Sequence, residues 1–171
     1  MFKLLKKVGR LVFPGHTVKG TENVVKGAPS VFACNHAGAY GPVVMQLFFP
    51  YKYRPWVIHS ITEPGKCAKY LADNFLKDEV NIPEPFNKWI AAVIAPLCIK
   101  IMKAVEAIPV YRGKTQIMKT FQTSLEAFMK GYAVLIFPEN KDVKFSKFVD
   151  GFYTGFVYLA RQLYRKTGQN L

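Results

Sequence analysis

The stretch YAVLIFPEN, residues 132–140, decides the fold. Its first six residues are apolar or aromatic, and a run this short that ends at a turn signal is typical of a buried strand rather than a helix. The polar residues Glu139 and Asn140 follow Pro138 at once. We therefore predict a central strand over residues 132–137 that leads into a polar turn.

Three further short apolar runs have the same character. They are SVFAC (residues 30–34), WVIHSI (56–61) and IPVY (108–111). Segments with helical periodicity separate most of the strands, and this alternation is typical of α/β domains with a parallel sheet. We predict an α/β fold, with a mostly parallel or mixed central sheet flanked by helices, over residues 1–171 as a single domain.

Apolar spacing and breaker residues locate the helices. Residues 115–130 are the clearest case, because apolar side chains recur at helical spacing and Gly131 follows as a cap. The other predicted helices are residues 2–13, which are amphipathic, 43–49, 66–77, 88–106 and 151–167. Residues 18–25 are predicted to form a strand with a turn.

The chain is strongly basic. Its 171 residues include 24 Lys and Arg against 11 Asp and Glu, so the formal net charge is +13. This charge favours an anionic partner, which is nucleic acid, anionic lipid or an anionic substrate. No RNP, helix-turn-helix or zinc-finger pattern accompanies the charge, so nucleic acid is not an expected partner.

The three cysteines, Cys34, Cys67 and Cys98, are widely spaced and form no CxxC pair. This pattern argues against a disulfide framework and a zinc site, and we predict no bound metal. Each cysteine lies among apolar residues, as expected of a small core side chain in a reducing, cytosolic environment.

Two apolar segments are candidates for contact with a membrane. Residues 2–13 place apolar side chains on one side and four cations around the other, which fits either an interfacial helix or a helix packed on its own core. Residues 88–106 contain Pro96 and Lys100, so we predict no spanning helix. Trp89 at one end and lysines near the other fit shallow insertion, and the alternative is a core helix.

Polar residues follow three of the predicted strands. Asn35 and His36 follow the first, and Arg112 and Glu139 follow two others. Ligands of open α/β sheets bind beyond the carboxyl ends of strands, so we expect one shared crevice. There the histidine would act as a general base towards a hydroxyl, and the arginine would hold a phosphate in a bidentate fork. The glutamate would bind a glycerol-type hydroxyl or support the histidine.

Each of these residues also has a plainer interpretation. A loop histidine can bond its own turn, Arg112 can be a surface cation, and Glu139 can be a solvated turn residue. His16 and His59 lack such polar neighbours, and we predict a loop residue and a structural residue there. Cys34 raises the alternative of a Cys–His nucleophile, which the apolar surroundings of its thiol disfavour.

Three short motifs in this order resemble the acyltransferases of glycerophospholipid synthesis, typified by the 1-acylglycerol-3-phosphate acyltransferases. They are NHAGAYG (residues 35–41), IPVYR (108–112) and FPENKD (137–142). Downstream, FVDG (148–151) and LA (159–160) also match the family's pattern. The resemblance extends from the first of the strands into the last predicted helix.

This resemblance implies that the protein is a membrane-surface acyltransferase of phospholipid biosynthesis with His36 as general base. Acyl-CoA or acyl carrier protein would donate the acyl group as co-substrate, with no other cofactor. A lysophospholipid or glycerol-phosphate-type lipid would accept it at the cytoplasmic face of an anionic membrane, where the protein is peripheral. The implied catalytic residues are His36 and Glu139, and the implied substrate-binding residues are Asn35, Arg112, Pro138, Asn140 and Lys141.

The sequence departs from the family's pattern at several positions. Gly41 stands where the family has an aspartate that orients the imidazole, and the candidate substitutes are Glu139, Asp142 and Asp150. Asn140 replaces a glycine of the third motif, and Asp142 stands where an arginine often falls. The alternative function is therefore a non-catalytic lipid-binding relative that lost the His–Asp pair. The chain ends before the family's fourth motif, so we expect a C-terminal truncation.

Overall fold

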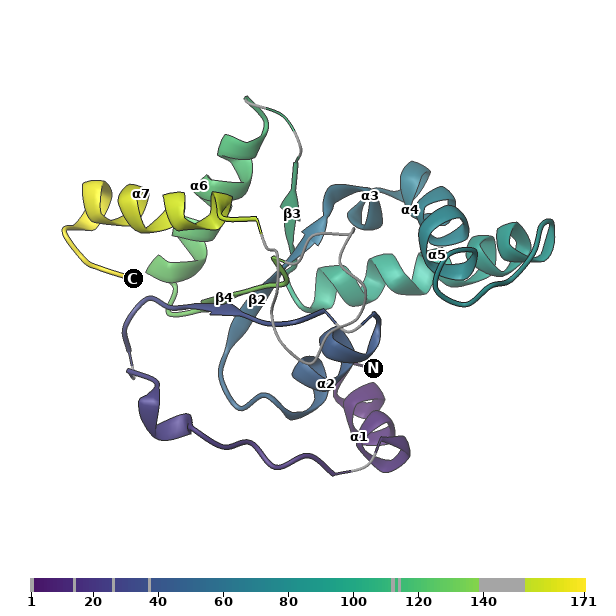
Figure 1. Cartoon of the computed structure of the whole chain (residues 1–171), viewed down its shortest axis with the longest axis horizontal. Helices are drawn as coiled ribbons and strands as arrows, with labels where there is room; N and C mark the ends of the chain where they lie inside the picture. The colour runs from purple at the N-terminus through teal and green to yellow at the C-terminus, as the bar shows by residue number, and fades with distance from the viewer. Residues whose placement is uncertain are drawn as a thin grey trace. The chain divides into compact units, whose positions relative to one another are not determined.

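The computed structural model describes residues 2–13, 15–25, 27–36, 38–111, 113, 115–138 and 153–171. The chain divides into two compact units (Figure 1). The first unit comprises Met1–Tyr53 and Ser124–Leu171, and the second comprises Arg54–Thr123.

The first unit is built on a pair of parallel strands. β1 (Val31–Ala33) pairs with β4 (Ala133–Ile136), with Phe32 opposite Leu135. The backbone N–H of Cys34 donates to the carbonyl of Ile136 at 2.9 Å, so pairing continues one residue beyond β1. β4 provides much of the core, because its last three side chains are fully or almost fully buried. The prediction of a buried strand within residues 132–137 is thus confirmed.

Two N-terminal helices pack closely in this unit. α1 (Phe2–Val12) lies on α2 (Tyr40–Phe48), where an added Cβ at Gly9 would come within 2.8 Å of the Leu47 side chain. The guanidinium of Arg10 donates to the Leu47 carbonyl at 2.8 Å. The absence of a side chain at residue 9 therefore permits the close approach of the two helices.

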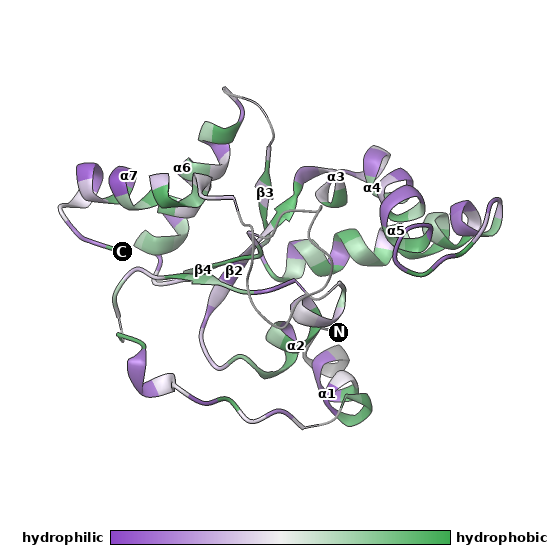
Figure 2. Ribbon diagram, viewed as in Figure 1, coloured by the Kyte–Doolittle hydropathy of each residue, from purple (hydrophilic) through white to green (hydrophobic). Residues whose placement is uncertain are grey.

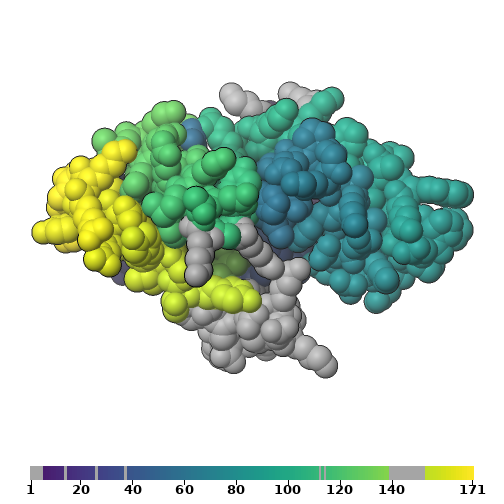
Figure 3. Space-filling view, turned by 90° about the horizontal axis from the view of Figure 1, so that it is seen from above, coloured from purple at the N-terminus to yellow at the C-terminus, as the bar shows by residue number. Residues whose placement is uncertain are grey.

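The C-terminal helix completes the first unit. α7 (Tyr158–Thr167) lies beside α6 (Ile117–Met129), as Figures 1 and 3 both show. Leu159 and Leu163, four residues apart on α7, are fully buried. This spacing places the apolar side of α7 against the core and leaves its basic side exposed.

The second unit also contains a parallel strand pair. β2 (Tyr53–Ile58) pairs with β3 (Ile108–Val110), with Val57 opposite Pro109. The connection between these strands consists of α3 (His59–Thr62), α4 (Pro64–Tyr70), the π-helical turn η2 (Leu71–Leu76) and α5 (Phe86–Ala104). A core of small and aliphatic side chains joins α4 and η2 to α5, namely Cys67, Leu71, Ala72, Leu76, Ala91 and Ala95.

Several elements differ from the sequence-based expectations. Residues 18–25 hold no strand but the short 3-10 turn η1 (Thr21–Asn23), which follows Gly20 in a left-handed conformation with φ of 80°. β2 ends at Ile58 because the chain turns into α3 there. α7 begins at Tyr158 after the turn η3 (Gly155–Val157), and residues 151 and 152 lie outside the described part of the chain.

The predicted fold class is confirmed. β1 pairs with β4 in the first unit and β2 pairs with β3 in the second, both pairings are parallel, and helices follow or connect the strands. Within the described ranges, no helix has the length and apolar character needed to cross a membrane.

Candidate active site

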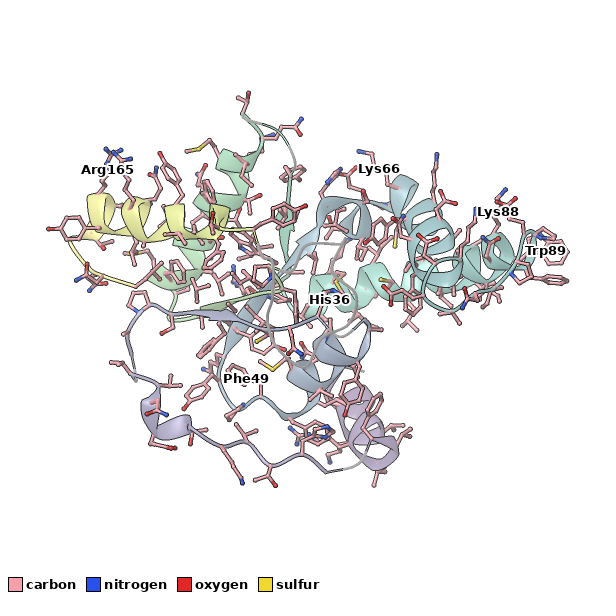
Figure 4. The ribbon with its side chains drawn as sticks, viewed as in Figure 1. His36, Phe49, Lys66, Lys88, Trp89 and Arg165 are labelled. Carbon is pink, nitrogen blue, oxygen red and sulfur yellow. The ribbon has the colours of Figure 1, made fainter. Side chains whose placement is uncertain are left out.

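His36 lies just beyond the carboxyl end of β1 (Figure 4). Pairing with β4 continues to Cys34, so Asn35 and His36 leave the sheet directly after the last ladder hydrogen bond. The exposed His36 imidazole meets the ring of Phe137 edge-on, with centroids 5.0 Å apart and an interplanar angle of 70°. Since Phe137 directly follows β4, the structure brings the first and third sequence motifs together at the ends of two adjacent strands.

The turn behind His36 is unusually tight. The backbone N–H of Gly41 donates to the His36 carbonyl at 3.1 Å where α2 begins. A Cβ added at Gly41 would overlap that carbonyl oxygen and would lie 2.8 Å from the Asn35 carbonyl oxygen. Both obstacles are backbone atoms, so no rotamer change relieves the clash. This turn requires glycine at position 41, and an aspartate fits there only if the backbone moves.

The start of the third motif is fixed by burial and by a backbone hydrogen bond. Pro138 is buried, and its carbonyl accepts a hydrogen bond from the Tyr153 backbone N–H at 2.8 Å. The chain before residue 139 and the chain after residue 152 are thus joined beside the end of β4. The predicted site residues Glu139, Asn140 and Lys141 lie outside the described residues.

Other predicted residues are also outside the described part. Arg112 is one of them, as are Asp142 and Asp150, the other candidate substitutes for the family aspartate. Of the seven predicted site residues, the structure therefore describes Asn35, His36 and Pro138. These three lie in the first unit, at the carboxyl ends of β1 and β4.

The strand that leads to Arg112 is fixed by a buried threonine in the second unit. The Thr120 side chain donates to the Pro109 carbonyl at 2.8 Å and accepts from the Tyr111 backbone N–H at 3.3 Å. Thr120 is 1% exposed. It therefore attaches the end of β3 to α6, immediately before the predicted phosphate ligand.

His59 occupies a position that sequence reasoning treated as structural. It follows β2, as His36 follows β1, and its ring stacks on Tyr111 at 5.2 Å. The Nδ1 atom of His59 is buried and has no hydrogen-bond partner among the described residues. His59 follows its strand as directly as His36 does, but no polar residue like Asn35 precedes it, and its structural role stays a prediction.

Cys34 has the properties of a structural thiol. Burial raises the pKa of Cys34 to about 11, so its thiol is protonated at neutral pH. A nucleophilic cysteine requires the thiolate, whose formation this environment opposes. The neighbouring Tyr53 hydroxyl is similar, since burial first and Cys34 second raise its pKa. The Cys–His alternative is therefore disfavoured by both sequence and structure.

His16 is held against α2 in the same unit. Its Nε2 atom lies 2.7 Å from the Tyr40 hydroxyl, and its ring packs on Phe48 with centroids 4.8 Å apart. Among the residues that the structure describes, no group of three or more His, Cys, Asp or Glu side chains is arranged to hold a metal ion.

The comparisons with known proteins support one family. The acyltransferase family model matches residues 87–167. This segment contains the motifs IPVYR (108–112) and FPENKD (137–142), whereas NHAGAYG (35–41) lies before it. Neither the curated proteins nor the solved structures give a significant match. The match covers just under half of the chain, agrees with the resemblance that the motifs indicate, and supports acyl transfer as the general activity.

Proposed function

We propose that this protein transfers a fatty acyl group from acyl-CoA or acyl carrier protein to the hydroxyl of a lysophospholipid or glycerol-phosphate-type acceptor. The observation that carries the proposal is the acyltransferase-family match over residues 87–167. The position of His36 beside Phe137, at the ends of two parallel strands, gives further support.

His36 is the general base in this reaction. It takes the proton from the acceptor hydroxyl as that oxygen attacks the thioester carbonyl carbon. The tetrahedral intermediate then expels the thiolate, which receives the proton from the imidazolium, so the products are an ester and a free thiol. General base catalysis of this kind contributes about 10²–10⁴ in rate. The edge contact with Phe137 restricts the orientations of the imidazole without blocking its exposed side.

The acceptor is bound through its phosphate and its glycerol hydroxyl. Arg112 holds the phosphate through two parallel hydrogen bonds, and Lys141 adds positive charge. Glu139 accepts a hydrogen bond from the hydroxyl or supports His36. The bonds from Thr120 to the end of β3 are consistent with this assignment, because they fix the backbone just before Arg112.

The reaction takes place at the cytoplasmic face of an anionic membrane, as part of phospholipid biosynthesis. The net charge of +13 favours adsorption to anionic lipid. On α1, Val8, Leu11 and Val12 are exposed, and Lys7 is exposed beside them. Because α1 contacts α2 through Gly9 and Arg10, this apolar edge is available to lipid, which favours the interfacial interpretation of the helix.

A second candidate function is a non-catalytic lipid-binding relative. The observation that favours it is the tight turn at Gly41, which leaves no room for the aspartate of the family's first motif. Loss of the group that orients a catalytic histidine costs about 10⁴ in turnover in the serine-protease case. A relative of this kind would retain the fold and the basic surface and bind lipid without turning it over.

One assay separates the two candidates. Labelled acyl-CoA is incubated with the protein and a panel of lysophospholipid and glycerol-phosphate acceptors, and the labelled ester is quantified by chromatography. In parallel, the melting temperature is measured with donor and with acceptor. The proposal predicts labelled ester with a phosphate-bearing acceptor and less with its phosphate-free analogue. Stabilisation by lipid without any ester would favour the non-catalytic relative. The absence of both ester and stabilisation would reject both candidate functions.

A further inference from the structure

α5 has two different faces along its length. Asn87, Ala91 and Ala95, each four residues apart, are buried against α4 and η2. The opposite face is apolar but open to solvent, with exposed fractions of 55% for Phe86, 65% for Trp89, 39% for Ile90, 79% for Val93 and 47% for Leu97. Phe86, Ile90, Val93 and Leu97 are spaced three or four apart, and Trp89 comes three residues after Phe86 and four before Val93. The five side chains therefore form one continuous stripe. We call them the outer stripe of α5.

The outer stripe consists of apolar side chains, whereas the solvent-facing side of a surface helix is usually polar or charged. Figure 2 shows hydrophobic colour along much of α5, and Figure 4 shows Trp89 projecting from the N-terminal end of the helix. Phe86 and Trp89 also pack edge-on, with ring centroids 5.9 Å apart. Exposed apolar side chains are common singly, but a contiguous group of large ones marks a surface that binds a partner.

The charges on α5 indicate the nature of that partner. The helix contains Lys88, Lys100 and Lys103 but no Asp or Glu. Lys88 is paired with Glu84, which precedes the helix, at 2.8 Å. Lys100 falls three residues after Leu97, at the C-terminal end of the outer stripe. The stripe thus runs from two aromatic rings at one end to a lysine at the other.

We propose that the outer stripe of α5 inserts into the interface of an anionic lipid bilayer. The aliphatic side chains contact acyl chains, Trp89 lies at the level of the headgroups, and Lys100 contacts lipid phosphate. A second copy of the chain fits less well, because two α5 helices packed face to face would oppose lysines without any carboxylate on either helix. The proposal extends the membrane part of the proposed function and does not depend on the transfer chemistry.

The test measures binding to vesicles, which requires no enzymatic activity. The full chain with Trp56→Phe, which leaves Trp89 as its sole tryptophan, is titrated with vesicles of phosphatidylcholine alone and of phosphatidylcholine with phosphatidylglycerol. We expect a blue shift of Trp89 fluorescence, quenching by brominated acyl chains, and stronger binding to the anionic vesicles. Val93→Glu should weaken binding by about tenfold or more, because it removes an aliphatic group that the bilayer would cover and adds a charge that anionic lipid repels.

The matched control is Ala92→Glu, the same charge change on an exposed neighbour that lies off the outer stripe. It should weaken binding much less than Val93→Glu. Circular dichroism checks that both variants are folded, which we expect because both sites are exposed. Equal effects of the two variants, equal binding to neutral vesicles, or no binding to either vesicle would overturn the proposal. A concentration-dependent dimer that Val93→Glu dissociates, with no vesicle binding, would instead identify a second copy as the partner.

Discussion

Position 41 determines how closely the chain turns behind His36. We predict that Gly41→Asp lowers stability by about 1–3 kcal/mol or more, because its Cβ would meet two backbone carbonyl oxygens. The same variant should lower acyl transfer rather than restore it, since the displaced backbone carries Asn35 and His36. Urea unfolding and the transfer assay test the two effects.

Two further glycine variants separate the steric effect from that of the carboxylate. Gly41→Ala has no carboxylate and should lose most of the same stability. At Gly65, in α4, an added Cβ meets no described atom within 4 Å, so Gly65→Ala should be neutral or slightly stabilising. A stable Gly41→Asp variant with raised activity would show instead that the turn opens readily and that the site had decayed by loss of the aspartate.

The reactivity of the Cys34 thiol should depend strongly on pH. Because its pKa is raised to about 11, the thiolate fraction at neutral pH is very small and increases about tenfold per pH unit until the pH approaches that value. Alkylation of Cys34 by iodoacetamide, followed by peptide mass spectrometry, should therefore be slow at pH 7 and accelerate up to about pH 11. Cys34→Ala should keep its transfer activity. Rapid labelling at pH 7 with loss of activity would support the Cys–His alternative.

At the scale of elements, one side chain links β3 to α6. Thr120→Val removes the hydroxyl that bonds both the Pro109 carbonyl and the Tyr111 N–H, and it leaves these part-buried groups without that partner. We predict a loss of about 1–3 kcal/mol in the free energy of unfolding, measured in urea. Thr123→Val is the control on the same helix, because its hydroxyl bonds the Lys119 carbonyl one turn earlier. Equal losses for the two variants would contradict the special role of Thr120.

Strand ends could be predicted from sequence where an apolar run meets a polar or turn residue. This rule located the ends of β1 and β4, and hence Asn35, His36 and Pro138. It failed for residues 18–25, where β-branched residues favour a strand but Gly20 turns left-handed and breaks it. It also missed the end of β2, because the run WVIHSI contains no Gly or Pro and hydrophobicity alone does not show where α3 begins.

Close approaches of backbone to backbone could not be predicted at all. The motif comparison showed that Gly41 lacks a carboxylate, but the clash with the carbonyls of Asn35 and His36 depends on the angle at which α2 leaves the turn. Likewise, the stacking of His59 on Tyr111 joins residues 52 positions apart in sequence, so that no local pattern reports it.

At the scale of the whole molecule, the net charge and the family match favour compatible functions. The net charge of +13 favours anionic lipid or an anionic substrate, and the family match over residues 87–167 supports acyl transfer. The matched segment contains two of the three motifs but not His36. The role of this histidine is therefore tested directly.

The most direct test is the initial rate of acyl transfer in His36→Ala compared with the wild type. The control is His16→Ala, a histidine of the same unit that bonds the Tyr40 hydroxyl. We predict that His36→Ala loses about 10²-fold or more in rate while remaining folded, and that His16→Ala stays within a few-fold of the wild type. Equal rates for His36→Ala and the wild type would contradict this prediction.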